Sequence, residues 1–158
     1  MAKEVERKFL VKDAAWRDAV EDSIAIVQFY LAISSERSIR LRISNGKSAK
    51  LTLKFGSDLN QRDEFEYPVP LADAHEMLGF AIGTVIRKTR HHVRHENYLY
   101  EVDVFNGELD GLVVAELETM DKVADALLPP WLGEEVTGEL RYSNASLALN
   151  GFPERVLR

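Results

Sequence analysis

Charged and apolar residues alternate along most of this chain with the period of a β-strand. Successive side chains of a strand point to opposite faces, so each run places its charges on one face and mostly apolar residues on the other. Like charges at such close spacing repel one another, which indicates a purpose other than stability. Metal cations and a polyanion between the strands are the simplest explanation. Seven segments share the pattern: Glu4-Val-Glu6-Arg-Lys8, Arg40-Leu-Arg42, Lys50-Leu-Thr-Leu-Lys54, Glu64-Phe-Glu66, Lys88-Thr-Arg90, Glu101-Val-Asp103 and Glu116-Leu-Glu118.

The elements expected from these patterns are mostly strands. Helices are expected at 13–22, at 71–78, at 121–128 before Pro129-Pro130, and in a short stretch from Asn144 as N-cap to Gly151. Many strands with few helices indicate a mainly antiparallel β fold with flanking helices, of the α+β class, whose sheet closes into a barrel. The seven or eight expected strands lie at about 3–11, 24–34, 37–45, 48–56, 61–69, 84–95, 98–106 and 112–119.

Alternation alone leaves open which face of the barrel is charged. Charged strand faces are commonly solvated, and the residues between the charges would then form an ordinary core. Charges that face inward would line a wet tunnel, whose apolar outer wall would need helices or partner subunits to cover it, which makes a homodimer plausible. The separation of acidic from basic strands favours the tunnel. The apolar residues concerned are Val5, Leu41, Leu51, Leu53, Phe65, Val102 and Leu117.

The composition suits one globular domain over residues 1–158, with 46% hydrophobic residues. The absence of cysteine excludes disulfides, thiolate metal sites and a cysteine nucleophile. A net charge of -6 argues against a general nucleic-acid binder. No apolar stretch approaches the roughly 20 residues that cross a bilayer, and the chain is charged from Lys3 onward, so we expect a cytoplasmic protein without membrane or nucleic-acid partners.

The acidic doublets supply the hard oxygen ligands that Mg²⁺ prefers, usually one or two carboxylates completed by waters and substrate phosphates. One such doublet is common on an exposed strand. Several of them opposite basic strands are less easily explained as surface. The candidates are Glu4, Glu6, Glu116 and Glu118, with Asp103, preceded by Glu101, as a further ligand.

The basic residues form the complementary set, because arginine offers a planar fork to phosphate oxygens and lysine a compact charge. The sequence has neither a G-x-x-x-x-G-K-[ST] loop nor a G-x-S-x-G elbow, so phosphate binding would depend on side chains and no covalent nucleophile is indicated. The basic run from Arg87 to His95 lacks both aromatic interleaving and zinc-ligand spacing. The candidates are Lys8, Arg40, Arg42, Lys54, Lys88 and Arg90, with Lys50 equally explained as a surface residue.

Glu4-Val-Glu6-Arg-Lys8 resembles the Glu-x-Glu-x-Lys signature of the CYTH superfamily, the triphosphate tunnel metalloenzymes. This resemblance implies an eight-stranded closed antiparallel β-barrel with a charged interior, which hydrolyses or cyclises triphosphate-bearing substrates with Mg²⁺ or Mn²⁺. The similarity continues in order through Gln28-Phe-Tyr30-Leu31, Arg40-Leu-Arg42, Leu51-Thr-Leu-Lys54, Glu64-Phe-Glu66-Tyr67, Lys88-Thr-Arg90, Glu101-Val-Asp103-Val-Phe105, Glu116-Leu-Glu118, Glu135-Val-Thr137 and Arg141-Tyr142-Ser-Asn144.

The resemblance also implies roles for individual residues. Lys8 and Tyr30 would act together on the attacking water, and Glu64, Glu66 and Glu101 would be further tunnel acids, the first two binding metal or holding basic residues in place. The implied metal ligands are Glu4, Glu6, Asp103, Glu116 and Glu118, and the implied phosphate-binding residues are Lys8, Arg40, Arg42, Lys54, Lys88 and Arg90.

The function expected from the resemblance is that of a metal-dependent tripolyphosphatase, since the chain looks most like the short bacterial members that split inorganic triphosphate. Class IV adenylate cyclase is the enzymatic alternative, but the His-Phe pair that precedes the first Glu in that branch is absent here, where Met1-Ala-Lys3 stands. Other organic triphosphatases, acting on thiamine or nucleoside triphosphates, remain open. So does a noncatalytic module that binds polyphosphate or nucleotide.

Overall fold

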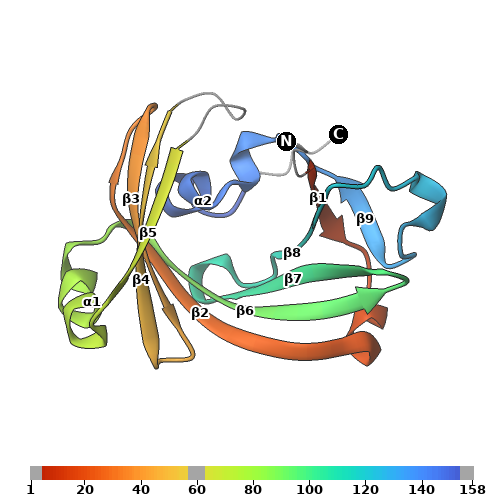
Figure 1. Cartoon of the computed structure of the whole chain (residues 1–158), viewed down its shortest axis with the longest axis horizontal. Coiled ribbons are helices and arrows are strands. Elements are labelled where there is room, and N and C mark those ends of the chain that lie inside the picture. The colour runs from red at the N-terminus through yellow and green to blue at the C-terminus, as the bar shows by residue number, and fades with distance from the viewer. Residues whose placement is uncertain (1–4, 57–62, 154–158) are drawn as a thin grey trace.

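The computed structural model describes residues 5–56 and 63–153, which form one antiparallel sheet with two α-helices (Figure 1). The strands are β1 (Val5–Val11), β2 (Val20–Ile33), β3 (Arg37–Ser44), β4 (Ser48–Phe55), β5 (Asp63–Val69), β6 (Ile82–His95), β7 (Tyr98–Asn106), β8 (Val113–Thr119) and β9 (Leu132–Glu135), and the helices are α1 (Leu71–Met77) and α2 (Asn144–Asn150). Among the described helices, none has the length and apolar character that crossing a membrane requires.

The strands follow the order β5-β4-β3-β2-β6-β7-β8-β1-β9 in the sheet. The sheet is strongly curled, with α2 on its concave side and α1 on the opposite side (Figure 1). Within the described ranges, no pairing joins the edge strands β5 and β9. The antiparallel β fold with flanking helices is therefore confirmed, whereas closure into an eight-stranded barrel is not.

Most of the expected elements are present. All eight predicted strand regions contain strands, and α1 and α2 lie where helices were expected. The N-cap of α2 is Ser143 and not Asn144, because the Ser143 Oγ accepts a hydrogen bond from the Ser146 amide at 3.1 Å. The four-residue β9 was missed, since Leu132 to Glu135 shows no alternation and depends on distant pairing with β1.

Two predicted helices are wrong. The region 13–22 contains only a 3₁₀ turn from Ala15 to Ala19, and β2 already begins at Val20, which pairs with Val93 of β6. The region 121–128 contains only a 3₁₀ turn at Asp125–Leu127. Long-range ladder hydrogen bonds outweighed a weak local helical pattern in the first case, and in the second Val123 packs on the sheet while Leu127 stays exposed.

The convex side of the sheet is covered mainly by the chain itself. Ala74 of α1 packs on Phe29, Leu41 and Ile43, and Trp16 and Trp131 lie in loops that cover β6, β7 and β8. Of the apolar residues in the alternating strands, Leu41, Val102 and Leu117 are buried there. Phe65, which the tunnel interpretation places on the apolar outer wall, is 48% exposed on edge strand β5, beside Phe55. The homodimer stays a prediction.

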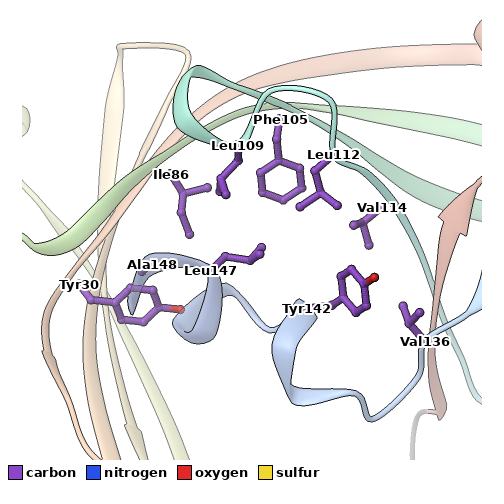
Figure 2. Packing of buried hydrophobic residues seen from close by; sticks show 10 residues of the cluster. All are labelled: Tyr30, Ile86, Phe105, Leu109, Leu112, Val114, Val136, Tyr142, Leu147 and Ala148. Carbon is purple, nitrogen blue, oxygen red and sulfur yellow. The ribbon is translucent and has the colours of Figure 1, made fainter. Parts of the chain in front are cut away.

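The concave side has an apolar end and a charged end. At the apolar end, Leu147 and Ala148 of α2 face side chains of the sheet, including Ile86, Phe105 and Tyr30 (Figure 2). On β6 and β7 the next residues with the same parity are Lys88, Arg90 and Asp103. The predicted charged segments thus face the interior of the curl, as the separation of their signs indicated.

Candidate active site

Strand register brings the charged residues of the concave face together. Residues directly opposite in an antiparallel pair share a face of the sheet. Arg90 of β6 lies opposite Asp103 of β7, Glu101 of β7 lies opposite Glu116 of β8, and Glu116 lies opposite Lys8 of β1. One continuous charged face therefore extends across four neighbouring strands.

Asp103 is the centre of a buried ion-pair cluster. Its carboxylate accepts hydrogen bonds from Arg90 Nε at 2.8 Å and Arg90 Nη2 at 3.0 Å, and lies 2.8 Å from Lys88 Nζ. Asp103 and Lys88 are only 4% and 2% exposed. Burial alone would raise the pKa of Asp103, but Lys88 and Arg90 outweigh burial and hold that pKa well below its usual range.

These contacts bear on the predicted metal role of Asp103. Both of its carboxylate oxygens contact a cation, and Lys88 also lies 3.4 Å from Asn144 Oδ1 of α2. Burial lowers the pKa of Lys88, and Asp103 opposes this shift. The geometry gives Asp103 a direct task, which is to hold Lys88 and Arg90 in their charged forms; its role as a metal ligand stays a prediction.

A second group of residues is cationic, and Asp103 and Glu101 act on it only through their charge. Arg42 Nε donates to Gln28 Oε1 at 2.8 Å, and Arg40 Nη2 donates to Thr52 Oγ1 at 3.3 Å. Within the described part of the chain neither guanidinium forms an ion pair. Burial lowers the pKa of Arg42 to about 10, and repulsion from Arg40 and Arg90 adds to the effect. An anion at this point would relieve both effects; we call Gln28, Arg40 and Arg42 the cationic corner.

The acidic side of the face is formed by β1 and β8. Burial raises the pKa of Glu6, the nearby Glu116 carboxylate and a hydrogen bond to it raise that pKa further, and Lys8 and Lys54 oppose the shift. Lys8 Nζ lies 3.4 Å from Glu116 Oε1 and 3.3 Å from the Tyr142 carbonyl oxygen. Glu118 lies opposite Glu6 in the register, and Glu4 lies outside the described residues.

Lys54 lowers the pKa of Glu6 although the two residues belong to strands that are far apart in the sheet. Lys54 belongs to β4 and Glu6 to β1, which are six places apart in the strand order. Their charges interact because the sheet curls until its two sides face each other (Figure 1). The cationic and acidic groups consequently lie on opposite walls of one curled sheet.

The donor set of Glu6 and Glu116 fits a divalent cation. These two neighbouring carboxylates repel each other when both are ionised, which raises the pKa of Glu6, and a cation between them would remove that repulsion. Mg²⁺ commonly takes only one or two protein carboxylates and completes its shell with waters and phosphate oxygens. Glu4 lies outside the described residues, and among the residues that are described, no three or more His, Asp or Glu side chains form a cluster suited to a metal.

Three other predicted residues, Tyr30, Glu64 and Glu66, lie beside the cationic strands β3 and β4. Tyr30 is 5% exposed in the apolar cluster under α2, and burial raises its pKa. Among the described residues no hydrogen bond joins Tyr30 to Lys8. Glu64 and Glu66 are exposed on edge strand β5, opposite Lys54 and Thr52.

Two neutral or weakly basic residues of this face were missed by sequence reasoning. His92 continues the parity of Lys88 and Arg90 on β6, and it contacts Asp22 through Nδ1 and Glu101 through Nε2, the latter at 3.4 Å. Glu101 also lies 3.4 Å from Arg90 Nη1. Gln28 is the second missed residue. Both have the parity of the concave face, a signal that could have identified them.

Comparisons with known proteins agree with this geometry. The family model for the CYTH domain matches residues 2–152. The chain is 38% identical over 153 residues to the inorganic triphosphatase of Acetivibrio thermocellus, which covers 96% of this chain and 97% of that protein. It is 36% identical over 151 residues to the inorganic triphosphatase of Nitrosomonas europaea, with 93% and 97% covered.

A solved structure is similar as well. The crystal structure of the inorganic triphosphatase NE1496 matches with a TM-score of 0.76 and 33% identity, over 94% of this chain and 96% of that one. The chain forms a curled antiparallel sheet whose cationic and acidic walls face each other. The CYTH family model matches nearly the whole length of the chain, and the match defines the class of protein. This chain belongs to the CYTH domain family.

Proposed function

We propose that this protein is a divalent-metal-dependent inorganic triphosphatase, a hydrolase of phosphoric anhydride bonds. The proposal rests on one observation: the cationic corner and the carboxylates of Glu6 and Glu116 lie on the same concave surface, and the guanidinium groups of the corner form no ion pair in the described part of the chain. The inorganic triphosphatases that resemble this chain at 36% and 38% identity support the choice of tripolyphosphate over organic triphosphates.

The substrate would lie between the two walls. The cationic corner and Lys54 bind phosphoryl oxygens from one side, while Lys88, Arg90 and Lys8 bind them from the other. Because phosphoryl transfer requires mainly positioning and charge neutralisation, side chains held in place by ion pairs suit the task. Asp103 then acts as a positioning residue that keeps Lys88 and Arg90 aimed at the substrate.

Glu6 and Glu116, with Glu118 and Glu4, are the residues proposed to hold Mg²⁺ or Mn²⁺. A bound divalent cation would neutralise phosphate charge and lower the pKa of a coordinated water. Lys8, which contacts Glu116, would orient the attacking water. Tyr30, predicted to act with Lys8 on the attacking water, is poorly suited to do so as a base, because its raised pKa disfavours the phenolate at neutral pH.

The predicted closed tunnel belongs to this proposal as the substrate-bound arrangement. The interaction of Lys54 with Glu6 across the curl supports it, since the two strands already lie within electrostatic reach of each other. A cytoplasmic location also remains part of the proposal, because inorganic triphosphate and free Mg²⁺ must both reach the site.

The proposal is tested by phosphate release from tripolyphosphate, ATP and thiamine triphosphate, each with Mg²⁺, with Mn²⁺ and with EDTA. We expect metal-dependent release that is highest with tripolyphosphate. A preference for ATP with pyrophosphate as the product would indicate the cyclase alternative. Tight binding of tripolyphosphate without release under all conditions would indicate the noncatalytic module.

A further inference from the structure

Gln28 is fully buried, at 0% exposure, where the charged and apolar ends of the concave face meet. It lies opposite Arg42 on β3 and opposite Ile86 on β6. A buried amide offers two donors and an acceptor, and each is costly to leave without a partner. The burial of Gln28 therefore requires an explanation, which its hydrogen-bond partners provide.

The contact with Arg42 fixes how the amide is turned. Arg42 Nε donates to the Gln28 oxygen at 2.8 Å, and a guanidinium can only donate. The oxygen must face Arg42, since the alternative would set two donors against each other. The Nε2 group consequently points away from Arg42.

Two buried donors in this corner have no acceptor. Gln28 Nε2 and Arg40 Nε both lack a hydrogen-bond partner among the described residues. The Tyr30 hydroxyl lies close enough to interact with both side chains: burial raises the pKa of Tyr30, and hydrogen bonding by Arg40 and by Gln28 opposes that shift. Two donors without a well-aligned acceptor lie beside two guanidinium groups that form no ion pair within the described residues, and an anion would supply what both lack.

We propose that Gln28 is a phosphate-binding and positioning residue: its oxygen orients Arg42, and its Nε2 donates to a phosphoryl oxygen that Arg40 and Arg42 also bind. This inference rests on the proposed function, because it assigns the same site a further residue. A neutral donor is suited to this place, since a third cation beside Arg40 and Arg42 would add to the repulsion that already lowers the pKa of Arg42.

The decisive variant is Gln28→Glu. A carboxylate keeps the acceptor that Arg42 uses and strengthens that contact, but it replaces the Nε2 donor with an oxygen that faces the substrate. We expect KM for tripolyphosphate to rise by at least about tenfold, with a smaller change in kcat, while the Tm of the free protein is unchanged or higher. Asn106→Asp makes the same amide-to-carboxylate change at an exposed position of β7 and should leave KM within about twofold.

Gln28→Met separates donation from simple charge repulsion. Methionine has a similar volume and no charge, so a rise in KM of at least about fivefold with this variant as well indicates a lost hydrogen bond. If KM rises with Gln28→Glu alone, the added charge is the cause and the inference is wrong. If Gln28→Met lowers Tm and leaves KM unchanged, Gln28 is only structural and the inference is also wrong.

Binding without hydrolysis keeps this test apart from the proposed function. Calorimetric titration with tripolyphosphate in EDTA measures the corner in the absence of turnover. If the unmodified protein binds tripolyphosphate but does not hydrolyse it, the proposed function fails, and about tenfold weaker binding by both Gln28 variants would still support the inference. If the unmodified protein hydrolyses tripolyphosphate and both variants bind it equally well, the inference fails alone.

Discussion

Asp103 determines whether two cations can remain buried on the concave face. Its carboxylate contacts both Lys88 and Arg90, and Lys88 is 2% exposed. Removing one partner of a buried pair leaves a charge without compensation, which typically costs about 3 kcal/mol or more. We expect Asp103→Asn to lower the free energy of unfolding by about 3 kcal/mol in metal-free buffer, measured by urea denaturation at pH 7.

The same measurement separates two roles for Asp103. If Asp103 were a metal ligand without ion pairs, Asp103→Asn would raise the free energy of unfolding in metal-free buffer or leave it unchanged. Because the folded pKa of Asp103 is depressed, its contribution is present above its unfolded pKa and is lost as pH falls through the folded value. The difference in free energy of unfolding between the unmodified protein and Asp103→Asn should thus become smaller below about pH 4. Asp110→Asn, at an exposed turn, is the control.

Glu6 is expected to behave in the opposite way. Burial and Glu116 raise its pKa, so the folded protein favours the protonated carboxyl and ionisation lowers stability as pH rises above the unfolded value. Metal binding needs the carboxylate, and activity should therefore be higher above neutral pH than below it. Glu6→Gln should keep or raise Tm and remove most activity at saturating Mg²⁺. Full activity of this variant would refute the ligand assignment.

Arg42 and Lys54 test the phosphate-binding wall. Both lie on the concave face, where a confined site makes charge effects larger than in open water. We expect Arg42→Ala and Lys54→Ala each to lower kcat/KM for tripolyphosphate by about thirtyfold, which corresponds to about 2 kcal/mol of transition-state stabilisation. Lys122→Ala changes an exposed lysine outside the alternating pattern and should be nearly neutral. Equal effects for all three variants would mean that the charged face does not bind substrate.

The charged residues of this site could be predicted because alternation places each of them on a known face of its strand. Neutral and weakly basic members were missed, since Gln28 and His92 add nothing to a pattern of like charges. The ion pair of Asp103 with Lys88 could not be predicted from the sequence either. It depends on which strands become neighbours, and β6 and β7 supply opposite signs only after the register is set.

At the scale of elements, the sequence predicted what local periodicity determines. The eight alternating strands and both α-helices were found on that basis. The early start of β2 at Val20 and the short β9 were missed because both depend on pairing with distant strands. Closure of the sheet is likewise a long-range property, and the alternation of a strand is the same in an open curl and in a barrel.

The position of α2 depends on one glycine of β6. Gly83 has φ +67°, and a Cβ at this position would lie 2.2 Å from the carbonyl oxygen of Ala148 in α2. We expect Gly83→Ala to lower stability by about 2 kcal/mol or more, because it combines backbone strain with a backbone collision. Gly46 has φ +63° with open space around it, so Gly46→Ala should cost only the strain, about 1 kcal/mol.

Thermal denaturation of these two variants checks the docking of α2. A clearly larger loss for Gly83→Ala than for Gly46→Ala supports close packing of the helix on β6. Equal losses would mean that α2 can move away from the sheet at little cost, and the apolar end of the concave face would then be open (Figure 2).

At the scale of the whole molecule, an acidic protein presents a site for a polyanion. The net charge is -6, so long-range attraction does not favour the substrate. Binding must therefore come from cations within contact distance, gathered on the concave side of the sheet. The curl brings Lys54 and Glu6 from distant strands to one space, which is what a substrate with several phosphates and a metal would require.

The most direct test of this account is the stoichiometry of tripolyphosphate hydrolysis, followed by ³¹P NMR with Mg²⁺ for the unmodified protein and for Glu116→Gln. We predict one orthophosphate and one pyrophosphate per tripolyphosphate consumed, no reaction in EDTA, and at least about a hundredfold slower reaction for the variant, whose fold should be intact. Tripolyphosphate that stays unchanged with the unmodified protein in Mg²⁺ and in Mn²⁺, or an equal rate for Glu116→Gln, would contradict the account.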